Sequence, residues 1–97
     1  MGYKIIFSSK ATEDLRNILV YIAETNSPNV AFDYVGKIEE AIEKLKEFPF
    51  LGKIPLTRPL QLKNFRVLAV DSHLIYYKVN EKDGVIKIYT VKHGRQN

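Results

Sequence analysis

Residues 65–91 read FRVLAVDSHLIYYKVNEKDGVIKIYTV and contain three runs that are rich in β-branched and aromatic residues. Such runs are typical of β-strands. Asp71 and Ser72 separate the first two runs, and the stretch NEKDG, which ends in Gly84, separates the last two. Because short polar spacers of this kind form hairpin turns, the stretch predicts an antiparallel meander of three strands.

Upstream of the meander, the sequence predicts a strand followed by a helix. Residues 3–8 have the composition of a short strand. Apolar residues then recur at helical spacing over residues 11–25, and Ser9 is the expected N-cap of this helix. Glu13 and Asp14 are expected to stabilise the helix start, because carboxylates there interact favourably with the helix dipole.

A second amphipathic helix is predicted to follow at once. Ser27 and Pro28 form a strong start signal, with serine as the N-cap and proline at the first helical position. The apolar stripe continues to Phe48, and Pro49 is expected to stop the helix. Residues 49–63 contain three prolines and predict an irregular, extended connection.

Together these elements predict an α+β fold with the order β-α-α-β-β-β. We expect two layers, in which an antiparallel helix hairpin covers one face of a sheet made of the N-terminal strand and the meander. The chain has 97 residues, of which 45% are hydrophobic and 27% charged. These values support a single globular domain over residues 1–97.

The composition also disfavours several classes of site and location. The sequence contains no cysteine, which excludes disulfides and thiolate metal sites, and it has no phosphate-binding loop or metal-ligand motif. We therefore expect no cofactor and no metal. The N-terminal stretch MGYKIIFSSK has too short an apolar run for a signal peptide, and no stretch approaches the ~20 apolar residues of a membrane span. We expect a cytoplasmic protein without membrane contact.

The charge is distributed unevenly along the chain. Residues 11–47 carry eight acidic and four basic side chains, whereas the rest of the chain carries three acidic and eleven basic ones. A basic region of this kind suggests a polyanion or an acidic protein as a partner. The alternative is that helix surfaces collect glutamate and strand edges collect lysine, which discourages aggregation.

One face of the predicted sheet has no helix to cover it, yet its strands are apolar on both faces. A solvated face normally carries polar side chains, so this pattern suggests a partner lying across the sheet. Alternatives are a homodimer through the same face, or partial cover by residues 49–63. The side chains that we assign to the uncovered face and to binding of this partner are Leu74, Tyr76, Tyr89 and Val91.

Basic and histidine side chains gather late in the chain, from Arg58 onward. The candidates for binding a target or a phosphate group are Arg58, Lys63, Arg66, His73, Lys92 and Arg95. If the protein cleaves RNA, the catalytic candidates are His93 for proton transfer and Arg66 and Arg95 for binding the phosphate. The alternative is that Arg66 pairs with a helix carboxylate and that His73 is a plain turn residue.

The most specific pieces of the sequence are Ala11-x-x-Asp14-Leu15-x-x-Ile18 with Tyr21-Ile22, Ser27-Pro28-x-x-Ala31, Phe48-Pro49-x-x-Gly52, Arg66-Val67-Leu68, Ile75-Tyr76-Tyr77 and His93-Gly94-Arg95. Their order and spacing resemble the ParE/RelE superfamily of toxins from type II toxin–antitoxin systems, over essentially the whole chain. The resemblance implies a small bacterial toxin that is neutralised by a cognate antitoxin covering its hydrophobic and basic surface. It also implies that operator DNA is contacted only through the antitoxin.

The superfamily contains two mechanisms. RelE-like toxins cleave mRNA on the ribosome, and ParE-like toxins poison DNA gyrase by trapping cleaved DNA. This chain has Leu74 and Leu68 where RelE-like toxins are expected to carry basic residues, and no tyrosine follows Arg95. The resemblance therefore favours a gyrase poison. A ribosome-dependent RNase that uses His93, and a non-toxic module that only binds the antitoxin, are the alternatives.

Overall fold

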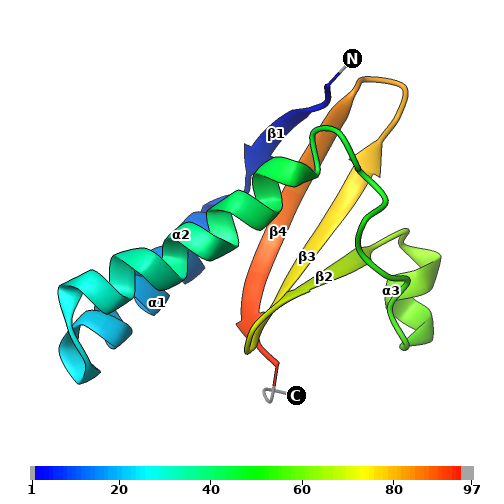
Figure 1. Ribbon diagram of the computed structural model, residues 1–97. Helices are drawn as coiled ribbons and strands as arrows, with labels where there is room; N and C mark the ends of the chain where they lie inside the picture. Colours follow the sequence, from blue (N-terminus) through cyan, green and yellow to red (C-terminus); the bar gives the residue numbers. More distant parts are fainter. Residues whose placement is uncertain (1, 95–97) are drawn as a thin grey trace.

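A computed structural model of the protein describes residues 2–94 and has the predicted two-layer α+β fold (Figure 1). The helices of this part are α1 (Ser9–Thr25), α2 (Pro28–Lys44) and α3 (Arg58–Leu62). Its strands are β1 (Lys4–Phe7), β2 (Arg66–Val70), β3 (His73–Asn80) and β4 (Val85–His93). Within the same residues, no helix combines the length and the apolar character that crossing a membrane requires.

The described strands form one sheet with the order β1-β4-β3-β2. β2, β3 and β4 form the predicted antiparallel meander, and β1 pairs with β4 in parallel, with Lys4 opposite Val85. The sheet is therefore mixed. The turn between β3 and β4 ends at Gly84, whose φ of 65° is a conformation that glycine adopts without strain.

Serine side chains start both long helices. Ser8, and not Ser9 as predicted, caps α1, because its Oγ accepts a hydrogen bond from the amide of Ala11 at 3.0 Å. The amide of Ser8 bonds to the carbonyl of Ile88, so Ser8 directly follows β1 along the edge of β4, and the helix begins at Ser9, one residue earlier than predicted. Ser27 caps α2 as predicted.

The prediction that the second helix continues to Phe48 is wrong, because α2 ends at Lys44. Beyond this residue, the amide of Leu45 bonds to the carbonyl three residues back, so the last turn tightens. The carbonyl of Lys46 then accepts a hydrogen bond from the amide of Tyr3 at 3.0 Å. The chain therefore leaves the helix where it can bond to the segment that precedes β1.

The prediction of a wholly irregular segment over residues 49–63 is also wrong, because this segment contains the short helix α3. Pro59 lies in the first turn of α3, where a proline has no helical hydrogen bond to lose. The side chain of Gln61 donates to the carbonyl of Pro55 at 2.7 Å and holds the preceding loop against the helix. The prolines therefore shape the helix start instead of preventing the helix.

The core lies between the α1–α2 hairpin and one face of the sheet (Figure 1). It contains side chains from both layers, namely Ala11, Ile38, Ile42, Leu45, Ile75, Tyr77, Ile86, Ile88 and Val91. The hairpin extends past the edge of the sheet, so its far end packs helix against helix only (Figure 1).

A β-bulge decides which side chains of β4 face the helices. Tyr76 lies opposite Thr90 and Tyr77 lies opposite Ile88, so Tyr89 is an extra residue in β4. An extra residue reverses the alternation of the side chains that follow it. Val91 is therefore buried, with an exposed fraction of 4%. The prediction that it lies on the uncovered face is wrong.

Candidate functional site

The face of the sheet away from the helix hairpin carries a groove of about 670 Å³, which we call the apolar groove. It is lined by Leu74 and Tyr76 of β3, side chains of β2, residues 51–57 and Leu60 of α3. Leu56 on its border is 97% exposed. The face opposite the helices is therefore partly covered by the segment 51–60, which agrees with the alternative of partial cover by residues 49–63. Two of the four side chains assigned to this face line the groove that remains.

A buried tyrosine fixes the loop that forms one wall of this groove. The hydroxyl of Tyr77 donates to the carbonyl of Pro49 at 2.8 Å and accepts from the amide of Gly52 at 2.9 Å. Burial raises the pKa of Tyr77, so the hydroxyl keeps the proton that it donates. A Cβ at Gly52 would lie 2.8 Å from both the Tyr77 hydroxyl and the carbonyl of Val67. Only glycine fits at this position without displacing the loop.

Arg66 holds the same loop from the end of β2. Its Nη2 donates to the carbonyl of Gly52 at 2.7 Å and to that of Phe50 at 3.3 Å. The guanidinium also lies over the Phe50 ring, 5.1 Å from the centroid. The structure thus shows Arg66 bonded to backbone carbonyls, and no ion pair with a helix carboxylate is among its contacts within residues 2–94.

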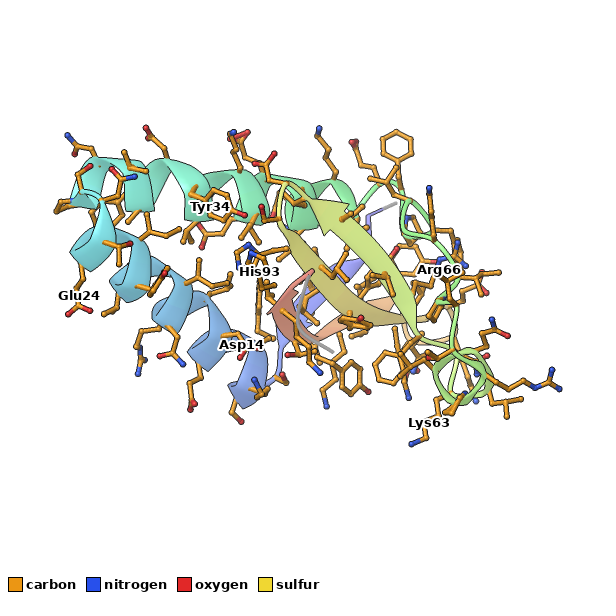
Figure 2. All side chains as sticks on the ribbon, turned by 90° about the horizontal axis from the view of Figure 1, so that it is seen from below. Asp14, Glu24, Tyr34, Lys63, Arg66 and His93 are labelled. Carbon is orange, nitrogen blue, oxygen red and sulfur yellow. The ribbon has the colours of Figure 1, made fainter. Side chains whose placement is uncertain are left out.

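Arg66 and His93 lie at opposite ends of the meander (Figure 2). Arg66 is opposite Tyr77, whereas Val70, at the other end of β2, is opposite His73, which in turn is opposite His93. This corresponds to roughly 13 Å along the strands, at about 3.3 Å per residue. The structure does not bring these two predicted catalytic residues together.

His73 and His93 form a ring pair on the helix side of the sheet, with centroids 5.3 Å apart. The hydroxyl of Tyr34 in α2 lies 2.6 Å from Nδ1 of His73 and accepts the amide of Ser72 at 3.3 Å. These two hydrogen bonds tie α2 to the start of β3. Burial lowers the pKa of His73, and the charge on His93 lowers it further. His73 is thus a packed strand residue and not a plain turn residue.

A second hollow on the open face, of about 610 Å³, contains lysines around an aromatic ring. We call it the lysine cleft and define it by Lys63, Lys78, Lys87 and Tyr89. Tyr89 was assigned to partner binding with the groove residues, but it lines this cleft instead. Among the other basic candidates, Lys92 lies over the Tyr76 ring at 5.9 Å.

The remaining candidates are scattered. Arg58 is exposed at the start of α3, and Arg95 lies outside the described residues. Within residues 2–94, no group of three or more histidine, aspartate or glutamate side chains is placed to hold a metal ion. Those predicted basic residues that fall within residues 2–94 therefore form no single site: they lie at the loop, at the histidine pair and on the open face.

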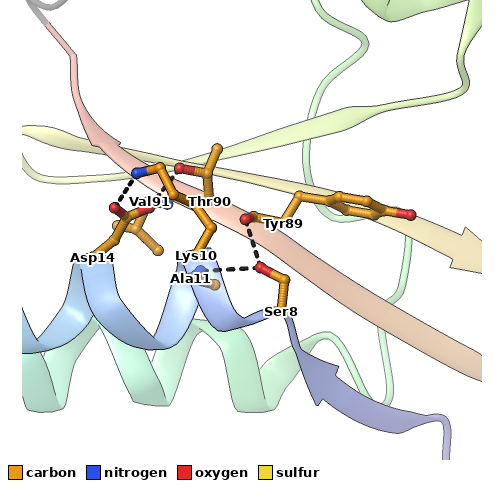
Figure 3. Close-up of polar contacts among 7 residues, drawn as sticks. All are labelled: Ser8, Lys10, Ala11, Asp14, Tyr89, Thr90 and Val91. Carbon is orange, nitrogen blue, oxygen red and sulfur yellow. Dashed lines mark hydrogen bonds and ion pairs between the residues drawn. The ribbon is translucent and has the colours of Figure 1, made fainter.

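Sequence reasoning missed the role of Asp14, which was interpreted as a helix-start residue. Asp14 is buried and accepts hydrogen bonds from the side chains of Lys10 and Thr90 and from the amide of Val91 (Figure 3). Burial raises the pKa of Asp14, but the three hydrogen bonds and the charge of Lys10 outweigh it, so the pKa is lowered from 3.8. One signal could have revealed this role: Asp14 falls within the apolar stripe that includes Ala11.

Comparison with known proteins places this fold in a family. A sequence model of the family described as "ParE toxin of type II toxin-antitoxin system, parDE" matches residues 5–97. The chain belongs to the ParE toxin family. The predicted ParE/RelE resemblance is thereby confirmed, and the protein is a toxin of a type II toxin–antitoxin system. A search of curated protein sequences finds no match.

Solved structures of toxin–antitoxin systems share the fold of this ParE family member. The chromosomal ParDE system from P. aeruginosa has a TM-score of 0.77 at 18% identity and covers 94% of this chain and 95% of that one. The RelBE2 complex from Mycobacterium tuberculosis has a TM-score of 0.69 at 19% identity, with 96% and 99% covered. The archaeal RelE–RelB complex from Pyrococcus horikoshii has a TM-score of 0.66 at 18% identity, with both chains fully covered at 100%.

Proposed function

We propose that this toxin acts in the cytoplasm by binding DNA gyrase and trapping it on cleaved DNA, and that it does not cleave mRNA. The observation that carries the proposal is the separation of Arg66 from His93. An RNA-cleaving site needs a proton-transferring group and cations around one phosphate. Arg66 is instead bonded to the loop carbonyls of Phe50 and Gly52 at the far end of β2.

The surroundings of His93 support the same proposal. Its ring partner is His73, whose lowered pKa makes it a poor cation near neutral pH. Leu74, the next residue of β3, contributes an apolar side chain to the groove. The family match, which is to the ParE toxins, agrees with a gyrase target.

An antitoxin is the expected occupant of the apolar groove. Two of the similar structures are described as toxin–antitoxin or RelE–RelB complexes, which supports a cognate antitoxin for this chain as well. The groove offers Leu74 and Tyr76 to apolar side chains of such a partner, and the exposed Leu56 extends this surface. Binding of operator DNA would then be a property of the antitoxin. Val91 is excluded from this interface because it is buried.

The experiment that tests the gyrase proposal is pulse-labelling of DNA and protein synthesis in bacteria just after induction of this chain without an antitoxin. The proposal predicts an early fall in DNA synthesis and induction of the DNA-damage response, with protein synthesis falling later. The variant His93→Gln should retain this effect. An early fall in protein synthesis would contradict the proposal, and unchanged growth would identify a non-toxic module that binds the antitoxin.

Ribosome-dependent mRNA cleavage is the second candidate function, because His93 at the end of β4 is a side chain of the type that transfers protons near neutral pH. Under this alternative, His93→Gln should lower mRNA cleavage on programmed ribosomes by roughly a hundredfold or more. The matched variant Arg66→Ala should have the same effect only if Arg66 moves away from the loop carbonyls.

A further inference from the structure

Two lysines face each other on neighbouring strands of the open face. Lys78 of β3 lies directly opposite Lys87 of β4 in the antiparallel register. Both side chains are half-buried, and their ammonium groups lie over the same ring, 5.3 Å and 4.9 Å from the centroid of Tyr89. Like charges directly opposite one another destabilise a sheet. A pair that costs stability and is held in place by an aromatic ring indicates a binding function.

The segment between α3 and β2 contributes further side chains to the surroundings of Lys78 and Lys87. Lys63 and Asn64 line the lysine cleft, and Phe65 places its ring 4.7 Å from the ammonium of Lys78. Asn64 has a positive φ of 63°, a conformation that often follows the last residue of a helix, here α3. Two carboxylates, those of Glu81 and Asp83, also line the cleft, and Asp83 is hydrogen-bonded to Asn80.

We propose that the lysine cleft binds the phosphodiester backbone of a nucleic acid. The ammonium groups of Lys78 and Lys87 both lie within 5.3 Å of the Tyr89 ring centroid, and ammonium groups bind phosphate oxygens through charge-assisted hydrogen bonds. Protein–nucleic acid interfaces are strongly positive, whereas lysine is depleted in protein–protein interfaces. These preferences favour a nucleic acid over an acidic protein as the ligand.

The lysine cleft differs from the two sites described above. It shares no lining residue with the apolar groove, so an antitoxin segment could occupy the groove while the cleft remains accessible. Lys78 is also five residues along β3 from His73, which is roughly 16 Å at about 3.3 Å per residue. Binding of a nucleic acid to the lysine cleft does not depend on the proposed gyrase target, because it can be measured with the purified chain in the absence of gyrase.

The test is the salt dependence of binding of the purified chain to a labelled DNA duplex and to a single-stranded RNA of the same length. The probe variant is Lys78→Gln/Lys87→Gln. The control is Arg16→Gln/Lys44→Gln, which removes the same charge from exposed positions of α1 and α2. The plot of log K, where K is the association constant, against log salt concentration has a negative slope. The magnitude of this slope should decrease by about 1.8 for duplex DNA, or by about 1.4 for a single strand, in the lysine-cleft variant and not in the control.

A thermal melt of the same variants separates binding from a structural role. The melting temperature of the lysine-cleft variant should stay close to that of the wild type, because relief of the repulsion between the lysines offsets the loss of their contacts with Tyr89 and Phe65. Equal salt slopes for this variant and the control, on both nucleic acids, would overturn the proposal. So would lysine-dependent binding of a poly-glutamate peptide in the absence of binding to either nucleic acid, since this would assign the cleft to an acidic protein.

Discussion

The carboxylate of Asp14 accepts a hydrogen bond from the backbone amide of Val91 at 3.0 Å, across a sequence separation of 77 residues. β1 ends at Phe7, opposite Ile88, so the later part of β4 has no strand beside it on that edge. The start of α1 supplies the missing partners: Asp14 bonds to Val91, and the Ser8 hydroxyl donates to the carbonyl of Tyr89 at 2.7 Å (Figure 3). The helix thus continues the sheet where β1 stops.

Replacing Asp14 should lower stability in a pH-dependent way. Asp14→Ala leaves the buried amide of Val91 without its acceptor, which costs about 1–3 kcal/mol in the free energy of unfolding. Folding lowers the pKa of Asp14 from its ordinary value of 3.8, so the ionised carboxylate stabilises the folded protein fully at pH values above 3.8. This stabilisation is lost as the pH falls through the pKa that Asp14 has in the folded protein. Urea unfolding at pH 7 and at pH 3 checks both effects. Glu13→Ala, an exposed neighbour, is the control, and equal losses in the two variants would contradict the account.

The bond between Tyr77 and the loop predicts two costly substitutions. Tyr77→Phe leaves the Gly52 amide and the Pro49 carbonyl without their partner, which should cost about 1–3 kcal/mol. Gly52→Ala should cost about 1–3 kcal/mol through the close contact of its Cβ with Tyr77. Thermal unfolding measures both. Gly36→Ala in α2, where a Cβ meets nothing within 4 Å, serves as the control and should be neutral or stabilising. Wild-type stability of Gly52→Ala would refute the geometry.

His73 should make stability fall on mild acidification. Its pKa is lowered from 6.5 in the folded protein, so the unfolded chain binds the proton more readily. The free energy of unfolding should therefore decrease as the pH falls below 6.5 and level off below the folded pKa. The groups facing His73 are the Tyr34 hydroxyl and His93, and the nearby ion pair of Lys37 and Asp71 lies at the same turn.

Urea unfolding between pH 8 and pH 5 measures this dependence. His73→Gln should remove the dependence of the free energy of unfolding on pH in this range. His93→Gln should only weaken this dependence, because the burial of His73 still lowers its pKa. An unchanged pH dependence in His73→Gln would show that other groups cause it.

Arg66 should act on the apolar groove through the loop that it holds. Arg66→Ala removes the bonds to the carbonyls of Phe50 and Gly52, so amides of residues 49–57 should exchange hydrogen faster. Dissociation of the antitoxin should then be faster, because the groove wall is less ordered. Arg66→Lys should restore part of both effects. Faster antitoxin dissociation without faster exchange would instead identify Arg66 as a direct contact.

Much of the fold followed from the sequence, because local signals and the global arrangement agree. The β-branched and aromatic runs of residues 65–91 and the Ser27–Pro28 start are encoded within a few residues each, and the structure confirms both. The end of α2 was not predictable in this way, since it depends on a bond between Lys46 and the distant Tyr3. The burial of Val91 depends on a bulge that alternation alone does not reveal.

The candidate site was less predictable than the fold. The basic candidates stand late in the chain, but their grouping depends on strand register. Register pairs Lys78 with Lys87 and places Arg66 far from His93. The role of Asp14 could be predicted only with the knowledge that β4 extends beyond the end of β1. The sequence therefore supplied the candidate residues, whereas the structure was needed to show which of them meet.

The most direct test of the central claim is a cleavage assay with purified DNA gyrase, supercoiled plasmid and this chain. Denaturation should release linear DNA linked to gyrase in amounts that rise with the toxin concentration. His93→Gln should give the same result as the wild type, because a protein ligand needs no acid/base group. Absence of trapped cleavage at every toxin concentration, together with cutting of mRNA on programmed ribosomes that is lost in His93→Gln, would contradict the account.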